Sequence, residues 1–290
     1  MRHYRQINFG PDAPSVTISE LDHPTYGCYT WPASVVLAAL LFQSKSDYAG
    51  KRILELGAGT ALVGLMMAKM GQAQSSEVVL TDHPLHEQVL QNIEHVIELN
   101  HLGRTAVVKP LAWGDFDGSI AQLLQCHTGG FDIIVGADLM YDPKDFEILL
   151  ATVAMILQSS PPDAVFLMAY QERSSRRSMQ WLLEKWGLSC RQVHYDMLTM
   201  MDWIESSMDL GQPVLPSDEC DVTNVGCCNT SPSTKRQTDL LSGLGTTANA
   251  VPLQHLPTKH LLEAPKQLQS GLMSVLVFEI RATPALSPEL

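Results

Sequence analysis

Lys51 to Gly64 reads KRILELGAGTALVG, and this stretch decides the fold class. Its first half is apolar enough for a buried strand. Gly57, Gly59 and Gly64 then let the backbone turn sharply and approach a ligand without a Cβ atom in the way. Helix-forming residues follow from Ala61 to Met70. A strand, a glycine turn and a helix in this order are where α/β folds hold a nucleoside cofactor.

Two residues of this stretch indicate which nucleoside. The dinucleotide fingerprint requires Gly or Ala three residues after its second Gly, but Leu62 stands there, which disfavours a pyrophosphate. Glu55 lies two residues before Gly57, where an acid would repel a pyrophosphate and attract a ligand ammonium group. S-adenosyl-L-methionine carries an ammonium group and no phosphate, so we expect it as the cofactor.

The next predicted strand, Glu77 to Thr81, is followed directly by Asp82. An acid at the tip of the second strand is placed to accept hydrogen bonds from both ribose hydroxyls of a nucleoside. The sequence Asp82-His83-Pro84 also suits a loop start or a helix N-cap. The order and spacing of the glycine turn and the acid favour the ribose role.

Composition and charge indicate which classes of protein the chain can belong to. The chain has 290 residues, 45% of them hydrophobic, which is enough for a full core. We expect an intracellular protein of cytoplasm and nucleus, because no apolar run is as long as a membrane span and MRHYRQINFG lacks a signal-peptide core. The net charge of −12 argues against direct nucleic-acid binding and suits a basic protein substrate. The six cysteines follow no disulfide or zinc pattern, so we expect reduced thiols and no metal.

Strands and helices alternate up to about residue 195, as in a Rossmann-like, doubly wound sheet. The predicted elements after Asp82 are a helix at His86 to Asn100, strands at Val107 to Trp113 and Phe131 to Asp138, a helix at Pro143 to Gln158, a strand at Ala164 to Tyr170, a helix at Ser174 to Trp186, and strands at Leu188 to Tyr195 and Met273 to Ile280.

Between the last two predicted strands the composition changes. Residues 206–271 are dominated by small polar residues and Pro, and no aromatic residue occurs between Trp203 and Phe278. Such a segment buries too little apolar surface to offset its ordering entropy, so it is predicted to be a disordered insertion. The expected domain is therefore residues 1–205 plus 272–282, with a flexible tail at 283–290. A group of Cys and His residues in the insertion matches no zinc module, namely Cys220, Cys227, Cys228, His255 and His260.

Seven strands with a terminal antiparallel hairpin and a glycine turn after the first strand resemble the seven-β-strand S-adenosylmethionine-dependent methyltransferases. Four further motifs resemble the family 16 lysine methyltransferase group. They are YTWPASVVLA with Trp31, LAWG with Trp113, GADLMY with Asp138 and Tyr141, and YQER at positions 170–173. The resemblance covers Tyr26 to about Trp203 and Met273 to Ile280, and it fails over the insertion.

The resemblance implies a role for each motif residue. Trp31 would cover the methionine end of the cofactor, where a sulfonium beside an indole face gains cation–π attraction, although core packing explains this Trp equally well. Trp113 would lie beside the adenine, and Ala137 would leave room for the adenosine. Gly57, Ala58 and Gly59 would make backbone contacts.

Asp138 and Tyr141 form an Asp-x-x-Tyr motif at the carboxyl end of the fourth predicted strand, the edge where α/β sheets meet ligands. Methyl transfer needs a nucleophile held about 3 Å from the methyl carbon and in line with it. Asp138 would orient a lysine ammonium group and Tyr141 would shape the channel or bond the amine. The alternative is that Asp138 caps the following turn and Tyr141 packs.

The sequence predicts a metal-independent protein methyltransferase acting on lysine. Arginine stays open, because Glu172 would supply a second acid to grip a guanidinium group. Two rivals are a methyltransferase for small molecules or nucleic acids on the same fold, and a catalytically silent binding module. The motif Asp138-Leu139-Met140-Tyr141 differs from the Asn-Pro-Pro-Tyr type used on bases, and the intact cofactor residues disfavour the silent module.

Overall fold

The computed structural model contains two β-sheets, one of seven strands and one of three, among the residues that it describes. These residues are 1–11, 13–44, 48, 50–71, 77–172, 179–207, 213–214 and 274–283.

The large sheet confirms the predicted fold class. Its strands, in spatial order, are β5 (Ala106–Pro110), β4 (Glu77–Asp82), β3 (Arg52–Glu55), β6 (Ile133–Ala137), β7 (Val165–Gln171), β10 (Val275–Ala282) and β8 (Leu188–Val193). The first five are parallel, and β10 runs antiparallel to both of its neighbours. Strand order reverses between β3 and β6, so their carboxyl ends form the switch point at which such sheets bind ligands.

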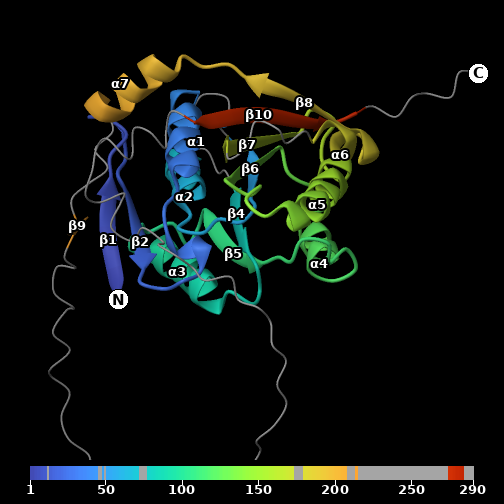
Figure 1. Ribbon diagram of the computed structural model, residues 1–290. Helices are drawn as coiled ribbons and strands as arrows, with labels where there is room; N and C mark the ends of the chain where they lie inside the picture. Colours follow the sequence, from blue (N-terminus) through green and yellow to red (C-terminus); the bar gives the residue numbers. More distant parts are fainter. Residues whose placement is uncertain are drawn as a thin grey trace, which may run out of the picture.

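Helices cover both faces of this sheet, as Figure 1 shows. On one side lie α1 (Pro32–Gln43), α2 (Leu62–Gly71) and α3 (Glu87–Leu99), and on the other lie α4 (Ser119–Cys126), α5 (Phe146–Gln158) and α6 (Gln180–Lys185). Successive residues of a strand point to opposite faces, so Ile53 joins the core under α1 to α3 while Leu54 joins the core under α4 to α6. Burial on both faces explains why the strands read as continuous apolar runs.

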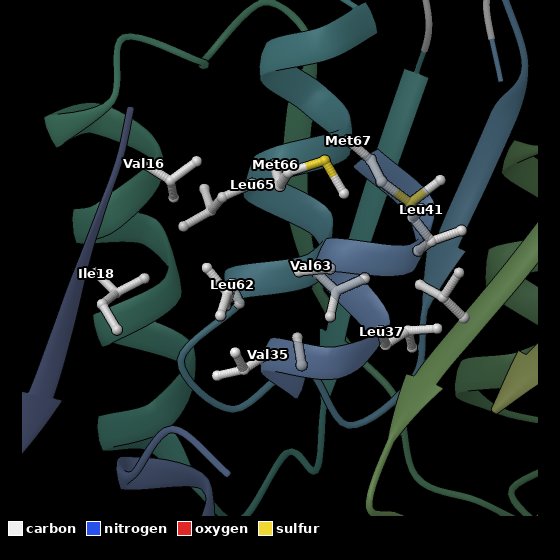
Figure 2. Close-up of a cluster of buried hydrophobic side chains, with 14 of the residues drawn as sticks. Val16, Ile18, Val35, Leu37, Leu41, Leu62, Val63, Leu65, Met66 and Met67 are labelled. Atoms are coloured by element: carbon white, nitrogen blue, oxygen red, sulfur yellow. The ribbon is translucent and has the colours of Figure 1, made fainter. Parts of the chain in front are cut away.

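A second, three-stranded antiparallel sheet was not expected from the sequence. It consists of β2 (Val16–Leu21), β1 (Arg2–Ile7) and β9 (Pro213–Val214). Figure 2 shows Val16 and Ile18 pointing from β2 towards Leu62 and Leu65 of α2, and all four side chains are buried. The small sheet therefore extends the hydrophobic core that supports the helix after the glycine turn.

A helix near the end of the domain was not predicted either. Helix α7 (Met197–Ser207) buries Met200, Met201 and Ile204 and packs against α1. These three residues recur at helical spacing, which is the signal that identifies the buried face. No helix in the described part of the chain has the length and apolarity to span a membrane.

Several predicted boundaries shift. The third strand ends at Pro110, so Trp113 lies in the turn after it rather than at its end. The helix expected from Pro143 begins at Phe146, because a 3₁₀ turn occupies Pro143–Asp145. The helix expected from Ser174 is described from Gln180 onward.

Most of the predicted insertion lies outside the described residues, together with its Cys and His group. Of residues 206–271, the structure describes 206–207 at the end of α7 and 213–214 in β9. The predicted tail at 283–290 is described at position 283 alone. The disorder of these segments and the domain limits drawn from it stay predictions.

Candidate active site

The glycine turn, residues 56–60, follows β3 and is tied to both neighbouring strands. The backbone N–H of Leu56 donates to the carbonyl of Val135 at 2.9 Å, and that of Ala58 donates to the carbonyl of Thr81 at 2.8 Å. Gly57 and Gly59 both have φ of +57°, which favours glycine. The turn is thus a fixed part of the sheet edge.

The surroundings of these glycines explain why a side chain is excluded. A Cβ atom at Gly57 would lie 2.7 Å from Cδ2 of Leu139 and 3.6 Å from Cζ2 of Trp113. A Cβ atom at Gly59 would lie 3.2 Å from the carbonyl oxygen of Gly27. The structure therefore brings Trp113 beside the glycine turn, as its predicted role requires. Gly64 serves packing, since a Cβ atom there would lie 2.1 Å from Cδ2 of Leu80.

Asp82 at the end of β4 is bonded to the glycine turn. One carboxylate oxygen accepts a hydrogen bond from Gly59 N–H at 3.0 Å, and the other accepts from His83 N–H at 2.8 Å. His86 Nδ1 lies 3.4 Å from the same carboxylate, and this hydrogen bond raises the pKa of His86. Since α3 begins at Glu87 with His86 as its N-cap, Asp82 is not the helix cap. Its bond to His83 does make it part of a local turn.

Glu55 is buried beneath the turn with 2% of its surface exposed. Its Oε2 accepts a hydrogen bond from Gly64 N–H at 2.9 Å, at the start of α2. Burial raises the pKa of Glu55 to about 8. The charge of Asp82 acts in the same direction, and the hydrogen bond from Gly64 acts against it. A buried acid of this kind favours a nearby cation, because a positive charge would offset its desolvation.

Asp138 begins the second turn of the site, the aspartate turn of residues 138–141 after β6. It has φ of +57° and is buried, with 6% of its surface exposed. Its backbone N–H donates to the carbonyl of Ala169 at 2.7 Å, and its Oδ1 accepts from Gln171 N–H at 3.4 Å. The carboxylate therefore contacts the end of β7. The 3₁₀ turn that follows is capped by Asp142, whose side chain accepts from Lys144 N–H.

Tyr141 and Trp31 lie at this edge of the sheet, and Tyr26 joins them. The Tyr26 ring lies 5.4 Å from that of Tyr141 and 6.1 Å from that of Trp31, between centroids. Trp31 Nε1 donates to the Tyr26 carbonyl at 3.0 Å. Burial and then the charges of Asp145 and Asp82 raise the pKa of Tyr141. Sequence reasoning missed Tyr26, although YGCYTWP places it next to a recognised motif.

The N-terminal sheet also reaches the glycine turn through polar contacts that the sequence did not reveal. Arg5 and Glu20 form a buried ion pair at 4.0 Å, and Glu20 accepts a hydrogen bond from Thr30 N–H at 3.0 Å. The Thr30 hydroxyl lies 3.0 Å from that of Thr60. Residues from β1 and β2 thus help hold the turn in place.

Comparison with known proteins decides the family. A family model described as lysine methyltransferase matches residues 11–184, which is more than half of the chain. The chain belongs to this lysine methyltransferase family. It is an S-adenosylmethionine-dependent protein methyltransferase, as the sequence predicted.

The names of two relatives specify different acceptor residues, arginine in one and lysine in the other. The chain is 38% identical to the Xenopus laevis histone-arginine methyltransferase METTL23 over 61% of its own length and 71% of the relative's. It is 34% identical to the Danio rerio protein N-lysine methyltransferase METTL21A over 57% of its own length and 70% of the relative's. A solved 16S rRNA methyltransferase of T. thermophilus is 21% identical, with a TM-score of 0.47, over 67% of this chain and 48% of that one.

The residues at the switch point fit S-adenosylmethionine. Two buried acidic residues lie at the glycine turn: Asp82 bonds Gly59 within it, and Glu55 bonds Gly64 at the start of the helix that follows. Asp82 places a carboxylate beside the turn, so a cationic nucleoside without phosphates suits this site better than an anionic cofactor does. The individual roles stay predictions: ribose for Asp82, adenine for Trp113, adenosine space for Ala137, and the methionine end for Trp31.

Proposed function

We propose that this methyltransferase transfers a methyl group to a basic side-chain nitrogen of a protein substrate. The observation that carries the proposal is the buried carboxylate of Asp138 at the carboxyl end of β6. Leu139 of the same turn lies against Gly57, so the acid and the glycine turn belong to one site. A buried carboxylate there attracts a cationic side chain and orients it.

Lysine is the acceptor that the sequence predicts, and the family description supports it. When bound, S-adenosylmethionine supplies a methyl group on a cationic sulfur, which an in-line nucleophile attacks. A lysine amine has a pKa of about 10.4 and must lose a proton first. Asp138 would hold the ammonium group on axis, and Tyr141 would shape the channel beside it. One carboxylate is sufficient for a point charge of this kind.

Arginine is the second candidate, and two observations favour it. Glu172 is exposed and directly follows Gln171, whose N–H contacts Asp138, so the chain carries a second acid next to the residue that bonds the first. The Xenopus laevis relative is named a histone-arginine methyltransferase. A guanidinium group keeps its proton, with a pKa above about 12, and its planar fork is gripped best by more than one acid.

The substrate is expected to be a basic protein of the cytoplasm or nucleus. The net charge of −12 supports this, because an acidic enzyme attracts a basic partner during diffusion. Direct binding of nucleic acid is not expected for the same reason.

Labelling in a cell extract tests the proposal. Purified wild type and Asp138→Asn are incubated with extract and radiolabelled S-adenosylmethionine, and labelled proteins are digested and sequenced by mass spectrometry. We expect a labelled basic protein in the wild-type reaction, and methylated lysine or arginine in the peptide separates the two candidates. Label on nucleic acid or small molecules would overturn the proposal. Cofactor binding without any label would favour the silent module.

A further inference from the structure

The ring of Tyr26 contacts two further aromatic rings, those of Trp31 and Tyr141. Tyr26 lies in the 3₁₀ turn Tyr26–Cys28, Trp31 is the residue before α1, and Tyr141 ends the aspartate turn. The ring of Tyr26 lies between the other two, at 6.1 Å from Trp31 and 5.4 Å from Tyr141. We refer to these three residues as the aromatic rim.

The rim is placed at the cofactor site by contacts of its own backbone. The carbonyl oxygen of Gly27, next to Tyr26, lies 3.2 Å from where a Cβ atom of Gly59 would stand. Tyr141 follows Asp138 by three residues and lies within the electrostatic influence of Asp82, whose charge helps raise the pKa of Tyr141. The rim therefore borders both turns of the site.

The rim is open to solvent although it is aromatic. Tyr26 is 44% exposed and Tyr141 is 41% exposed. Single exposed aromatic residues are common on protein surfaces. Contacting rings above buried carboxylates are a different arrangement, because ring faces and acids both attract cations.

We propose that the aromatic rim binds the cationic head of the acceptor side chain, with Tyr26 as the residue that positions it. This inference rests on the proposed function, since it assumes a basic acceptor. The head would contact the ring faces before it meets Asp138. Tyr26 acts on acceptor binding and not on cofactor binding, because its side chain points to the exposed rim while Gly27 contacts the glycine turn.

The test uses small cations, so it needs no known protein substrate. The full-length protein saturated with S-adenosylhomocysteine is titrated with n-butylammonium, methylguanidinium and neutral n-butanol. Binding is followed by the NMR signal of the Trp31 indole N–H, which donates to the backbone carbonyl of Tyr26 and so keeps its partner in side-chain variants. The two cations represent lysine and arginine heads.

We expect both cations to shift the Trp31 signal and butanol to leave it unchanged. Tyr26→Leu should weaken cation binding by about 3- to 30-fold, while Tyr26→Phe, which keeps the ring, should bind as wild type does. Affinity for S-adenosylhomocysteine should be equal in all three proteins. An equal shift with butanol, no shift with either cation, or unchanged binding by Tyr26→Leu would overturn the inference.

The result is separable from the proposed function. Cation binding at the rim is measured without catalysis. Its outcome is therefore independent of whether the extract experiment yields a labelled protein. Loss of cofactor affinity in both Tyr26 variants would also overturn the inference, because it would place Tyr26 in the cofactor site.

Discussion

The glycine turn and the aspartate turn lie side by side at one edge of the sheet. Each contains a residue with positive φ, which is a glycine in the first turn and an aspartate in the second. Gly57 and Asp138 both have φ of +57°. At Gly57 a side chain would collide with Leu139. At Asp138 a side chain is present in a conformation that costs roughly 1–2 kcal/mol for residues with a Cβ atom. The first turn therefore excludes a side chain, and the second retains one despite strain.

This difference indicates that the two turns have different roles in the site. Glycine residues in a turn allow a ligand to approach the backbone, which suits the cofactor. Strain retained at a ligand-binding edge points to a functional carboxylate. The hydrogen bond from Gln171 N–H gives Asp138 a structural benefit as well, of about 0.5–1.5 kcal/mol. The following predictions separate these contributions.

The largest effect is expected from Asp138→Asn on methyl transfer. Asn tolerates the same φ and keeps an oxygen for Gln171 N–H, but it lacks the charge that orients the acceptor. We expect kcat/KM on the labelled protein to fall about 100-fold or more, equivalent to about 2.7 kcal/mol of transition-state stabilisation. Initial rates provide the measurement. A variant that works at the wild-type rate would reduce Asp138 to a structural link between β6 and β7.

Asp82→Ala should weaken cofactor binding. The variant loses the predicted ribose acceptor and leaves Gly59 N–H without its carboxylate partner, which should cost about 1–3 kcal/mol. Calorimetry with S-adenosylhomocysteine measures the change. Asp163→Ala, an equal change of charge before β7 at the opposite edge of the sheet, serves as the control and should bind normally. Equal affinities in both variants would remove Asp82 from the cofactor site.

Substitutions at Gly57 and Asp138 should change stability by different amounts. Gly57→Ala introduces a strained φ and a collision with Leu139, so its free energy of unfolding should fall by roughly 1–2 kcal/mol or more. Asp138→Gly relieves strain and loses one hydrogen bond, so its stability should change by less than about 1 kcal/mol. Urea unfolding of both variants gives the comparison. A large loss in Asp138→Gly would show that the Gln171 contact dominates.

A further prediction concerns Glu55 and the pH dependence of stability. Burial raises its pKa to about 8 from an ordinary value of 4.5, so within this window the folded protein without ligand holds a proton that the unfolded chain has released. Stability should therefore fall as pH rises towards 8. Glu55→Gln keeps an oxygen for Gly64 N–H and should lose this part of the pH dependence. Identical pH profiles for variant and wild type would contradict the burial argument.

The cofactor half of the site was predictable because its signals are local. Gly57, Gly59 and Asp82 belong to one strand, helix, strand unit, and their residue types follow from turn geometry and charge. The seven-stranded sheet with its antiparallel hairpin also followed from periodicity and from the resemblance to a family. The exact roles of these residues towards the cofactor stay predictions, since they depend on contacts with a bound molecule.

The features that the sequence did not predict depend on contacts between residues far apart in the sequence. Strand β1 buries Arg5, and the short apolar alternation of Val16 and Ile18 in β2 stops at Glu20, the buried partner of Arg5, so neither strand shows the sustained alternation that marks a half-buried strand. Tyr26 begins a stretch that resembles the family but was assigned no role, and its contact with Tyr141 spans more than a hundred residues of sequence. Such juxtapositions arise from tertiary packing and leave little trace in a single sequence.

The claim that the two turns have different roles is tested most directly by calorimetry. The measured quantity is the affinity of Asp138→Asn for S-adenosylhomocysteine, compared with the affinities of wild type and Asp82→Ala. The account predicts that Asp138→Asn binds as tightly as wild type while Asp82→Ala binds at least about fivefold more weakly. Equal losses in the two variants would contradict it, because the aspartate turn would then belong to the cofactor site.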